Sequence, residues 1–119
     1  MMPRDTNPHG TIFGGVLLGH IDLAGAAGAQ HYVSCAGWPD QPMVTISLEK
    51  VEFLHPVFIG DIVSFWTRVL RVGRTSITMH VSVEADRQGR EEPLTEAQIT
   101  YVSIDDQRRP VPLRGPEAD

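Results

Sequence analysis

The most constraining feature of this 119-residue chain is an almost uncharged stretch from Phe13 to Ser34. Gly, Ala and aliphatic residues dominate it, and Asp22 is its only formally charged side chain. The stretch is long enough for a helix of about five turns. Its apolar residues leave almost no polar face, so we expect the helix to be buried nearly all round. Four internal glycines each cost about 1 kcal/mol of helix propensity relative to Ala, which predicts close packing against other backbone.

After this stretch the apolar pattern changes from helical to extended. Segments that alternate apolar and polar residues, or are rich in β-branched residues, follow at 44–49, 61–69, 75–83 and 94–104. The connections between them are short, so we expect an α+β domain in which an antiparallel sheet wraps around the helix. The length predicts a single domain over residues 1–119, with a loose tail after about Pro110.

The composition excludes several classes of protein. Ten basic and fifteen acidic side chains give a net charge of -5, which argues against a nucleic-acid partner, because nucleic acid binds dense basic surfaces. No apolar run approaches the roughly 20 residues that span a bilayer, and the polar N-terminus is not a signal peptide. Cys35 is the only cysteine, and we interpret it as a buried small residue. We therefore expect a soluble, cytoplasmic protein with no membrane partner.

Asp22 is the leading candidate for chemistry. None of the residues one helical turn away can neutralise its carboxylate; they are Leu18, Gly19, Gly25 and Ala26. Burying an unpaired carboxylate is costly, so Asp22 needs a partner from elsewhere in the fold, a water-filled cleft, or surroundings that favour its neutral form. From the residues alone, Asp22 is equally well explained as a general base or nucleophile and as a residue that faces a small wet surface or caps a neighbouring loop.

Two glycines, Gly14 and Gly15, stand at the expected start of the helix. They allow a ligand to approach the backbone closely, and the first turn offers free N–H groups at the positive end of the helix dipole. Such a site can hold a carbonyl oxygen that becomes negative during acyl transfer. A tight loop-to-helix turn is the plainer interpretation. Asn7 precedes Pro8, where Asn usually serves turn geometry.

A small group of arginines lies near the turn at 72–76. Arg74 is followed by the hydroxyls of Thr75 and Ser76, with Arg68 and Arg71 just upstream. This combination suits a phosphate group, although arginine at a strand end is more often plain solvated surface. No spacing of His, Cys or carboxylates resembles a metal site, and the chain has neither a P-loop nor a dinucleotide fingerprint. We therefore expect no metal and no bound cofactor.

Taken in order, several short segments resemble the hotdog-fold acyl-CoA thioesterases, in particular the group of bacterial YciA and of the brain-type cytosolic acyl-CoA hydrolases. They are Asp5-Thr6-Asn7, Gly10, Ile12-Phe13-Gly14-Gly15, Asp22, Val44-Thr45, Phe53, Pro56-Val57, Gly60-Asp61, Val72-Gly73-Arg74-Thr75-Ser76, Thr95-Glu96-Ala97 and Thr100-Tyr101-Val102. Each segment is weak alone. Their combination is specific, because they keep their order from residue 5 to about residue 105.

The resemblance implies a hotdog fold, a curved antiparallel sheet wrapped around one long central helix. The implied activity is hydrolysis of acyl-CoA to a free acid and CoA, so that CoA is part of the substrate and not a cofactor. By position, Asp22 is implied to be the general base or nucleophile, and Asn7 to orient the water or the thioester. The amides of Gly14 and Gly15 are implied to hold the carbonyl oxygen.

The same resemblance has implications for CoA binding and assembly. It places Arg74, Thr75 and Ser76 along the CoA groove, with Arg74 as the phosphate contact. It implies a homodimer with two sites at the subunit interface, often assembled further into tetramers or hexamers. Family members usually have a strand before the Asp-Thr-Asn segment, whereas only four residues precede it here. Either that strand is missing from this chain or the sheet is one strand short.

Two other functions stay open from the sequence. The segment 5–9 faintly resembles the Asp-x-Asn-Pro-x-His motif of hotdog enoyl-CoA hydratases, with His9 one residue too early. A non-catalytic hotdog module that binds acyl-CoA or a fatty acid is the other alternative, and Asp22 counts against it. The sequence fixes neither the acyl chain length nor the choice between CoA and acyl-carrier-protein thioesters.

Overall fold

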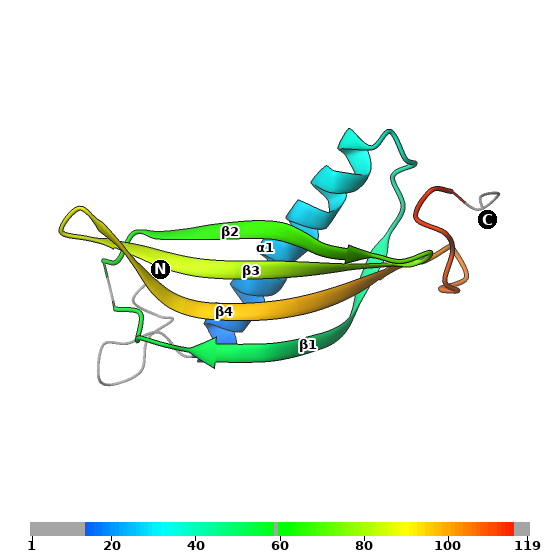
Figure 1. The fold of residues 1–119 in the computed structure, drawn as a ribbon. Helices are drawn as coiled ribbons and strands as arrows, with labels where there is room; N and C mark the ends of the chain where they lie inside the picture. The colour runs from blue at the N-terminus through cyan, green and yellow to red at the C-terminus, as the bar shows by residue number, and fades with distance from the viewer. Residues whose placement is uncertain (1–13, 59, 116–119) are drawn as a thin grey trace.

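The computed structural model describes residues 14–58 and 60–115, and it contains one long helix followed by four strands (Figure 1). They are α1 (Gly14–Cys35), β1 (Met43–Phe53), β2 (Val63–Val72), β3 (Ser76–Arg87) and β4 (Arg90–Ser103). The strands form one antiparallel sheet in the order β1-β4-β3-β2. The helix crosses one face of this curved sheet, which confirms the predicted α+β class.

The core lies between α1 and the sheet face that it covers. Every fourth residue of the helix is buried against the sheet; these are Leu17, Ile21, Gly25, Ala29 and Val33. Alternate residues of the two central strands meet them; these are Ile77, Met79, Val81 and Val83 on β3, and Ala97, Ile99 and Tyr101 on β4. Full burial of one such large apolar side chain contributes about 1.5–3 kcal/mol, so this layer holds the helix in place.

Two glycines bring the helix close to the sheet. A Cβ atom added at Gly25 would overlap the hydroxyl of Tyr101, and one added at Gly28 would lie 2.5 Å from Oγ1 of Thr67. The sequence predicts close packing of the helix glycines against backbone. At these two positions the neighbours are instead side chains of β4 and β2, because the sheet presents its side chains, not its main chain, to the helix.

Within residues 14–58 and 60–115, no element covers the other side of α1. Leu23 is 70% exposed, and exposed apolar side chains continue onto β1 and the loop before β2, where Ile46 is 59% and Ile62 73% exposed. The expectation of a helix buried nearly all round is therefore wrong for one chain, because a single sheet covers only one side of a helix. Large exposed apolar side chains in such numbers indicate a surface for another protein.

The C-terminal segment packs beside the turn between β2 and β3. Val111 and Leu113 are buried. The amide of Val111 donates to the carbonyl of Ser103 at 2.9 Å, and the amide of Leu113 donates to the carbonyl of Arg74 at 2.9 Å. This differs from the expectation of a loose tail after Pro110, because two apolar side chains and two backbone hydrogen bonds hold the segment on the sheet.

A charged cluster ties the loop before β2 to the β3–β4 hairpin. One Nη atom of Arg87 donates to Asp61 at 2.7 Å and to the carbonyl of Pro56 at 2.9 Å, and the other donates to Glu92 at 2.9 Å. Burial alone would raise the pKa of Asp61. Hydrogen bonds from Arg87 and from the amide of Phe58, together with the charge of Arg87, outweigh burial and lower that pKa.

Candidate active site

Asp22 lies on α1 opposite β1. Its side chain is half-buried, and Oγ1 of Thr45 donates a hydrogen bond to its Oδ1 at 2.8 Å. In the part of the chain that the structure describes, no Lys, Arg or His forms an ion pair with it. Of the three alternatives left open by the sequence, the structure shows a partner from elsewhere in the fold, and this partner is a neutral hydroxyl. The carboxylate is oriented without being neutralised, which suits a general base or a nucleophile.

The main chain at Asp22 is held by β4. The hydroxyl of Tyr101 donates to the carbonyl oxygen of Asp22 at 2.7 Å, and Tyr101 is only 1% exposed. Burial and the nearby negative charge of Asp22 raise the pKa of Tyr101, so its hydroxyl keeps its proton. Thr45 and Tyr101 are opposite each other in the β1–β4 ladder. One pair of facing residues therefore fixes both the side chain and the backbone of Asp22.

The helix begins at Gly14, so Gly14 and Gly15 lie in its first turn, as the sequence predicts. That turn carries no acidic side chain, so nothing within it neutralises the positive end of the helix dipole. Asp22 follows Gly15 by seven residues, a rise of about 10 Å along the helix axis. A reacting carbonyl needs contacts of about 3 Å on both sides. The rise along the helix exceeds the roughly 6 Å that two such contacts span.

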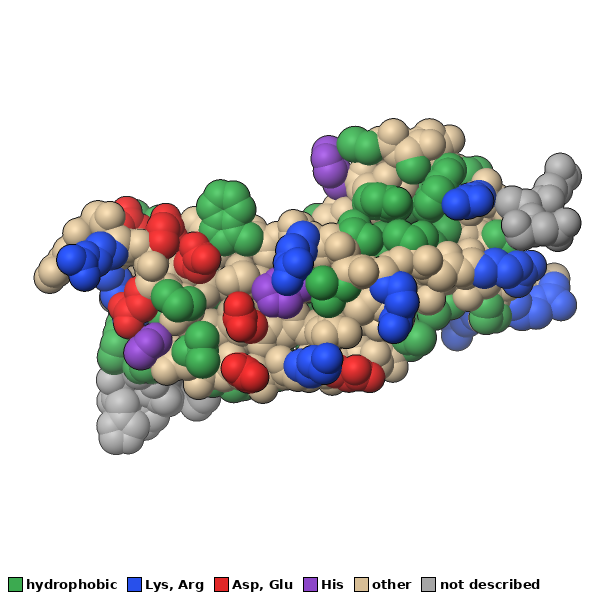
Figure 2. Space-filling view, in the orientation of Figure 1, with side chains coloured by type: hydrophobic (Ala, Val, Ile, Leu, Met, Phe, Trp, Pro, Cys, Tyr) green, Lys and Arg blue, Asp and Glu red, His purple; other side chains and the backbone are tan. Residues whose placement is uncertain are grey.

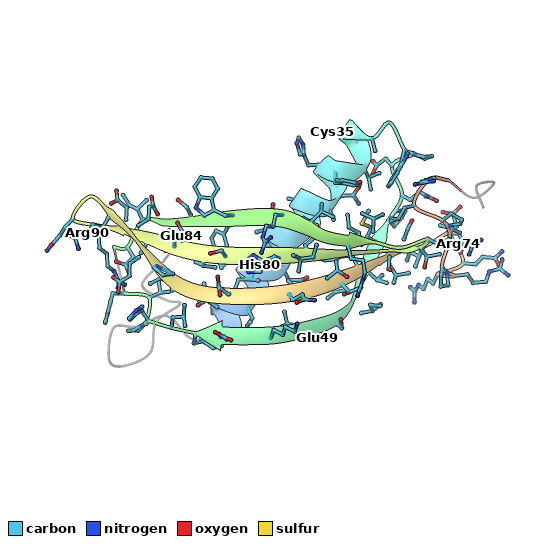
Figure 3. All side chains as sticks on the ribbon, in the orientation of Figure 1. Cys35, Glu49, Arg74, His80, Glu84 and Arg90 are labelled. Atoms are coloured by element: carbon cyan, nitrogen blue, oxygen red, sulfur yellow. The ribbon has the colours of Figure 1, made fainter. Side chains whose placement is uncertain are left out.

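The residues predicted to bind CoA lie at the turn between β2 and β3, where Figure 3 labels Arg74. Arg74 is exposed, while Thr75 and Ser76 are half-buried. The carbonyl of Ser76 accepts from the amide of Gly73 at 2.8 Å, and the carbonyl of Thr75 accepts from the amide of Ser103 at 2.9 Å. Among the described residues, no hydrogen bond joins this turn to Asp22. Asn7 lies outside the described residues.

Two residues around Asp22 have no role in the predictions from sequence. Thr45 and Tyr101 stand in segments that carry the family resemblance, which is the only signal that points to them. Their contacts with Asp22 span 23 and 79 residues, beyond the reach of any helical or strand spacing.

Other features of the described residues bear on the predicted classes. Within residues 14–58 and 60–115, no three His, Cys, Asp or Glu side chains lie close enough to hold a metal ion. In the same residues, no helix is long and apolar enough to cross a membrane.

The expectation of a buried Cys35 is wrong, because its thiol is exposed. The last turn of α1 extends past the sheet face that buries Val33. The Cys35 sulfur lies 3.5 Å from Nε2 of His31.

Comparisons with known proteins agree on one family. The sequence profile described as Thioesterase superfamily matches residues 9–92. The acyl-CoA thioester hydrolase YciA of Salmonella typhimurium is 35% identical over 117 residues, which cover 94% of this chain and 84% of that protein. The resemblance stated from the sequence is therefore confirmed.

Solved structures share the fold. A hexameric thioesterase from Yersinia pestis superimposes with a TM-score of 0.84 at 36% identity, covering 96% of this chain and 89% of its own. An acyl-CoA hydrolase from Staphylococcus aureus was solved with butyryl-CoA, CoA and CoA disulfide. It superimposes with a TM-score of 0.83 at 31% identity, and the match covers 100% of this chain and 71% of that chain. Alanine variants of that hydrolase at one aspartate and at one threonine have also been characterised. These structures confirm the predicted hotdog fold.

Proposed function

The chain belongs to the thioesterase superfamily, and we propose that it hydrolyses acyl-CoA thioesters to a free carboxylic acid and CoA. The YciA relatives from Salmonella typhimurium and Escherichia coli are acyl-CoA thioester hydrolases. The observation that carries the proposal in this chain is the Asp22 carboxylate, which Thr45 orients at 2.8 Å and no described cation neutralises. Thioester hydrolysis needs such a group, to activate water or to attack, and a site for the developing oxyanion.

Asp22 acts in the proposed reaction by one of two routes. As a general base it removes a proton from a water molecule, and the resulting hydroxide attacks the thioester carbon. As a nucleophile it attacks that carbon itself and forms an anhydride, which water then hydrolyses. In both routes the carbon–sulfur bond breaks and CoA leaves as the thiolate or thiol. Thr45 engages Oδ1, so we assign the reaction to Oδ2.

The oxyanion site is proposed at the first-turn amides of Gly14 and Gly15. Because these amides lie about 10 Å along the helix axis from Asp22, the two halves of one site come from different chains. We therefore propose a homodimer with two sites, each pairing Asp22 of one chain with the start of α1 of the other. The exposed Leu23 and Ile46 supply apolar surface for a second copy. The hexameric Yersinia pestis relative favours further assembly.

The remaining site residues keep the roles that the resemblance implies, as proposals. Asn7 orients the water or the thioester, and Arg74 contacts a phosphate of CoA beside Thr75 and Ser76. The exposed guanidinium of Arg74 is available for such a contact. The cytoplasmic location expected from the composition stays a prediction.

Release of free thiol from a panel of acyl-CoAs, from short to long chains, tests the proposed function. Wild type is compared with Asp22→Asn and with Asp86→Asn, a change at an exposed aspartate on β3. We expect turnover by wild type and Asp86→Asn, and its loss in Asp22→Asn. If wild type binds acyl-CoA but releases no thiol from any chain length, the hydrolase proposal fails and the non-catalytic binding module is favoured.

A further inference from the structure

Tyr101 carries its hydroxyl into the apolar layer between the sheet and α1. The side chain is 1% exposed, and Ile77 and Ile99 are buried on the same inner face of β3 and β4. Figure 2 shows the sheet from the side away from α1, where charged side chains lie over the strands. Side chains of a strand alternate between its two faces, so Tyr101 cannot reach those charged groups. Its buried hydroxyl therefore needs a partner on the helix side.

The partner is the main chain of the helix at Asp22. The hydroxyl of Tyr101 donates to the carbonyl oxygen of Asp22 at 2.7 Å. Asp22 lies inside α1, where each carbonyl also accepts from the amide four residues further along. A carbonyl oxygen has two lone pairs, so the bond from Tyr101 is additional to the helical one. It ties the helix to β4 at the residue that carries the proposed chemistry.

Gly25 provides the space for this contact. A Cβ atom added at Gly25 would overlap the hydroxyl oxygen of Tyr101, and it would lie 3.2 Å from Cζ of the same ring. Glycine is less favourable than alanine inside a helix, and a tyrosine hydroxyl is costlier to bury than an unsubstituted ring. Each residue is thus unfavourable by itself, and the hydrogen bond to Asp22 requires both of them.

Thr45 and Tyr101 constrain different parts of Asp22. Thr45 donates to Oδ1 of the carboxylate from β1, whereas Tyr101 donates to the carbonyl oxygen from β4. The first contact turns the side chain, and the second sets the place of the main chain from which that side chain extends. Most of the layer between helix and sheet is apolar, and apolar packing is not directional. Tyr101 therefore supplies a directional contact that fixes α1 at this level.

We propose that Tyr101 is a positioning residue for the reaction at Asp22, and that Gly25 provides the space that this role requires. The inference rests on the proposed function. Tyr101 is buried and acts through the helix, so its loss should change the rate of the chemical step more than the binding of substrate. A reacting group displaced by about 1 Å can lose roughly 100-fold in rate.

Tyr101→Phe removes the hydroxyl and keeps the buried ring. We expect kcat for thiol release from acyl-CoA to fall about tenfold, part of the loss that a full misplacement causes, and KM to stay within about twofold of wild type. Ile99→Val is the matched control, because it removes one buried methyl group from the same face of β4 and breaks no hydrogen bond. Its kcat per folded molecule should equal that of wild type at a comparable loss of stability in urea. Equal kcat in Tyr101→Phe and Ile99→Val would overturn the proposal.

Gly25→Ala tests the space on the other side of the contact. The added methyl group overlaps the hydroxyl of Tyr101, so we expect kcat to fall further than in Tyr101→Phe. In the double variant the overlap is relieved, so Tyr101→Phe should raise kcat in the Gly25→Ala background although it lowers kcat in wild type. This change of sign measures the coupling between the two residues directly. Independent, additive losses would contradict the proposed pair.

The same assays separate this inference from the proposed function. Thiol release by wild type, with unchanged kcat in Tyr101→Phe, would keep the hydrolase and overturn the positioning role. No thiol release by wild type from any acyl-CoA would refute the hydrolase, and the positioning role would fall with it. A KM that rises while kcat stays constant would place Tyr101 at substrate binding instead, which also overturns the proposal.

Discussion

Asp22 on α1 and Asp61 before β2 have opposite electrostatic surroundings. The side chain of Asp61 is 14% exposed and lies 2.7 Å from a guanidinium nitrogen of Arg87. Asp22 accepts a hydrogen bond from the neutral hydroxyl of Thr45, and no cation among the described residues pairs with it. A carboxylate that is neutralised by a cation stabilises the fold, while one that is only oriented stays available for chemistry. From this contrast we predict that Asp61 contributes to stability and that Asp22 contributes to activity.

The largest expected effect is the loss of activity on substitution of Asp22, which distinguishes it from Asp61. Asp22→Asn should lower kcat at least about 100-fold, equivalent to about 2.7 kcal/mol of barrier. The free energy of unfolding should change by no more than about 0.5 kcal/mol, because an asparagine oxygen still accepts the hydrogen bond from Thr45. Steady-state kinetics and urea denaturation of the same preparation measure both quantities. A variant that keeps wild-type kcat would make Asp22 structural.

Asp61→Asn should give the reverse result. It weakens a charged hydrogen bond to Arg87, and such bonds contribute about 1.5–3 kcal/mol, so we expect the free energy of unfolding to fall by about 2 kcal/mol. The kcat per folded molecule should match wild type. Urea denaturation measures the loss, and a stability equal to that of wild type would show that the Asp61–Arg87 pair contributes nothing.

The lowered pKa of Asp61 also predicts a pH dependence of stability. The folded state holds this group below its ordinary value of 3.8, so it binds the proton less tightly than the unfolded state does. The contribution of Asp61 to the free energy of unfolding is therefore present above pH 3.8, and it is lost as the pH falls through the pKa of the folded state. We expect the difference in unfolding free energy between wild type and Asp61→Asn to narrow below about pH 4. A difference that is constant from pH 7 to pH 3 would refute this assignment.

A smaller effect is expected at Thr45. Thr45→Val keeps the shape of the side chain but removes the donor to Asp22, so kcat should fall about tenfold, close to 1.4 kcal/mol. Thr45→Ser retains the hydroxyl and should recover most of the activity. If serine and valine behave alike, the hydrogen bond has no part in positioning the carboxylate.

The smallest effect is expected at the turn between β2 and β3. Arg74→Ala should raise KM about threefold, the scale of one exposed ionic contact, and leave kcat unchanged, because a phosphate contact is made equally in the ground and transition states. Initial rates over a range of acyl-CoA concentrations separate the two constants. A fall in kcat without a change in KM would place Arg74 near the reacting atoms instead.

The secondary structure follows closely from the sequence, because helical and strand periods are local. The stretch predicted as a helix begins at Phe13, and α1 begins at Gly14. The four strand segments also match, although their ends move by several residues. The partner of Asp22 could not be predicted in this way, because Thr45 reaches it only after β1 docks beside the helix.

Two further features depended on parts of the chain that meet only in the folded state. Nothing in the local pattern around Gly25 indicates that the hydroxyl of Tyr101 occupies the space beside it. The apolar composition of α1 suggested burial on all sides, whereas Leu23 is 70% exposed. The apolar composition of α1 indicates only that its side chains favour an apolar environment. It does not distinguish a sheet of the same chain from the surface of a second copy.

The central claim is that each site joins Asp22 of one chain to the start of α1 of another, and coexpression of two inactive variants tests it most directly. Asp22→Asn removes the carboxylate, and Gly15→Pro removes an amide N–H in the first turn, where proline is tolerated. In a mixed dimer one site carries both changes and the other carries neither, so random mixing should restore about a quarter of wild-type thiol release. Activity no higher than that of either variant alone would contradict the shared site.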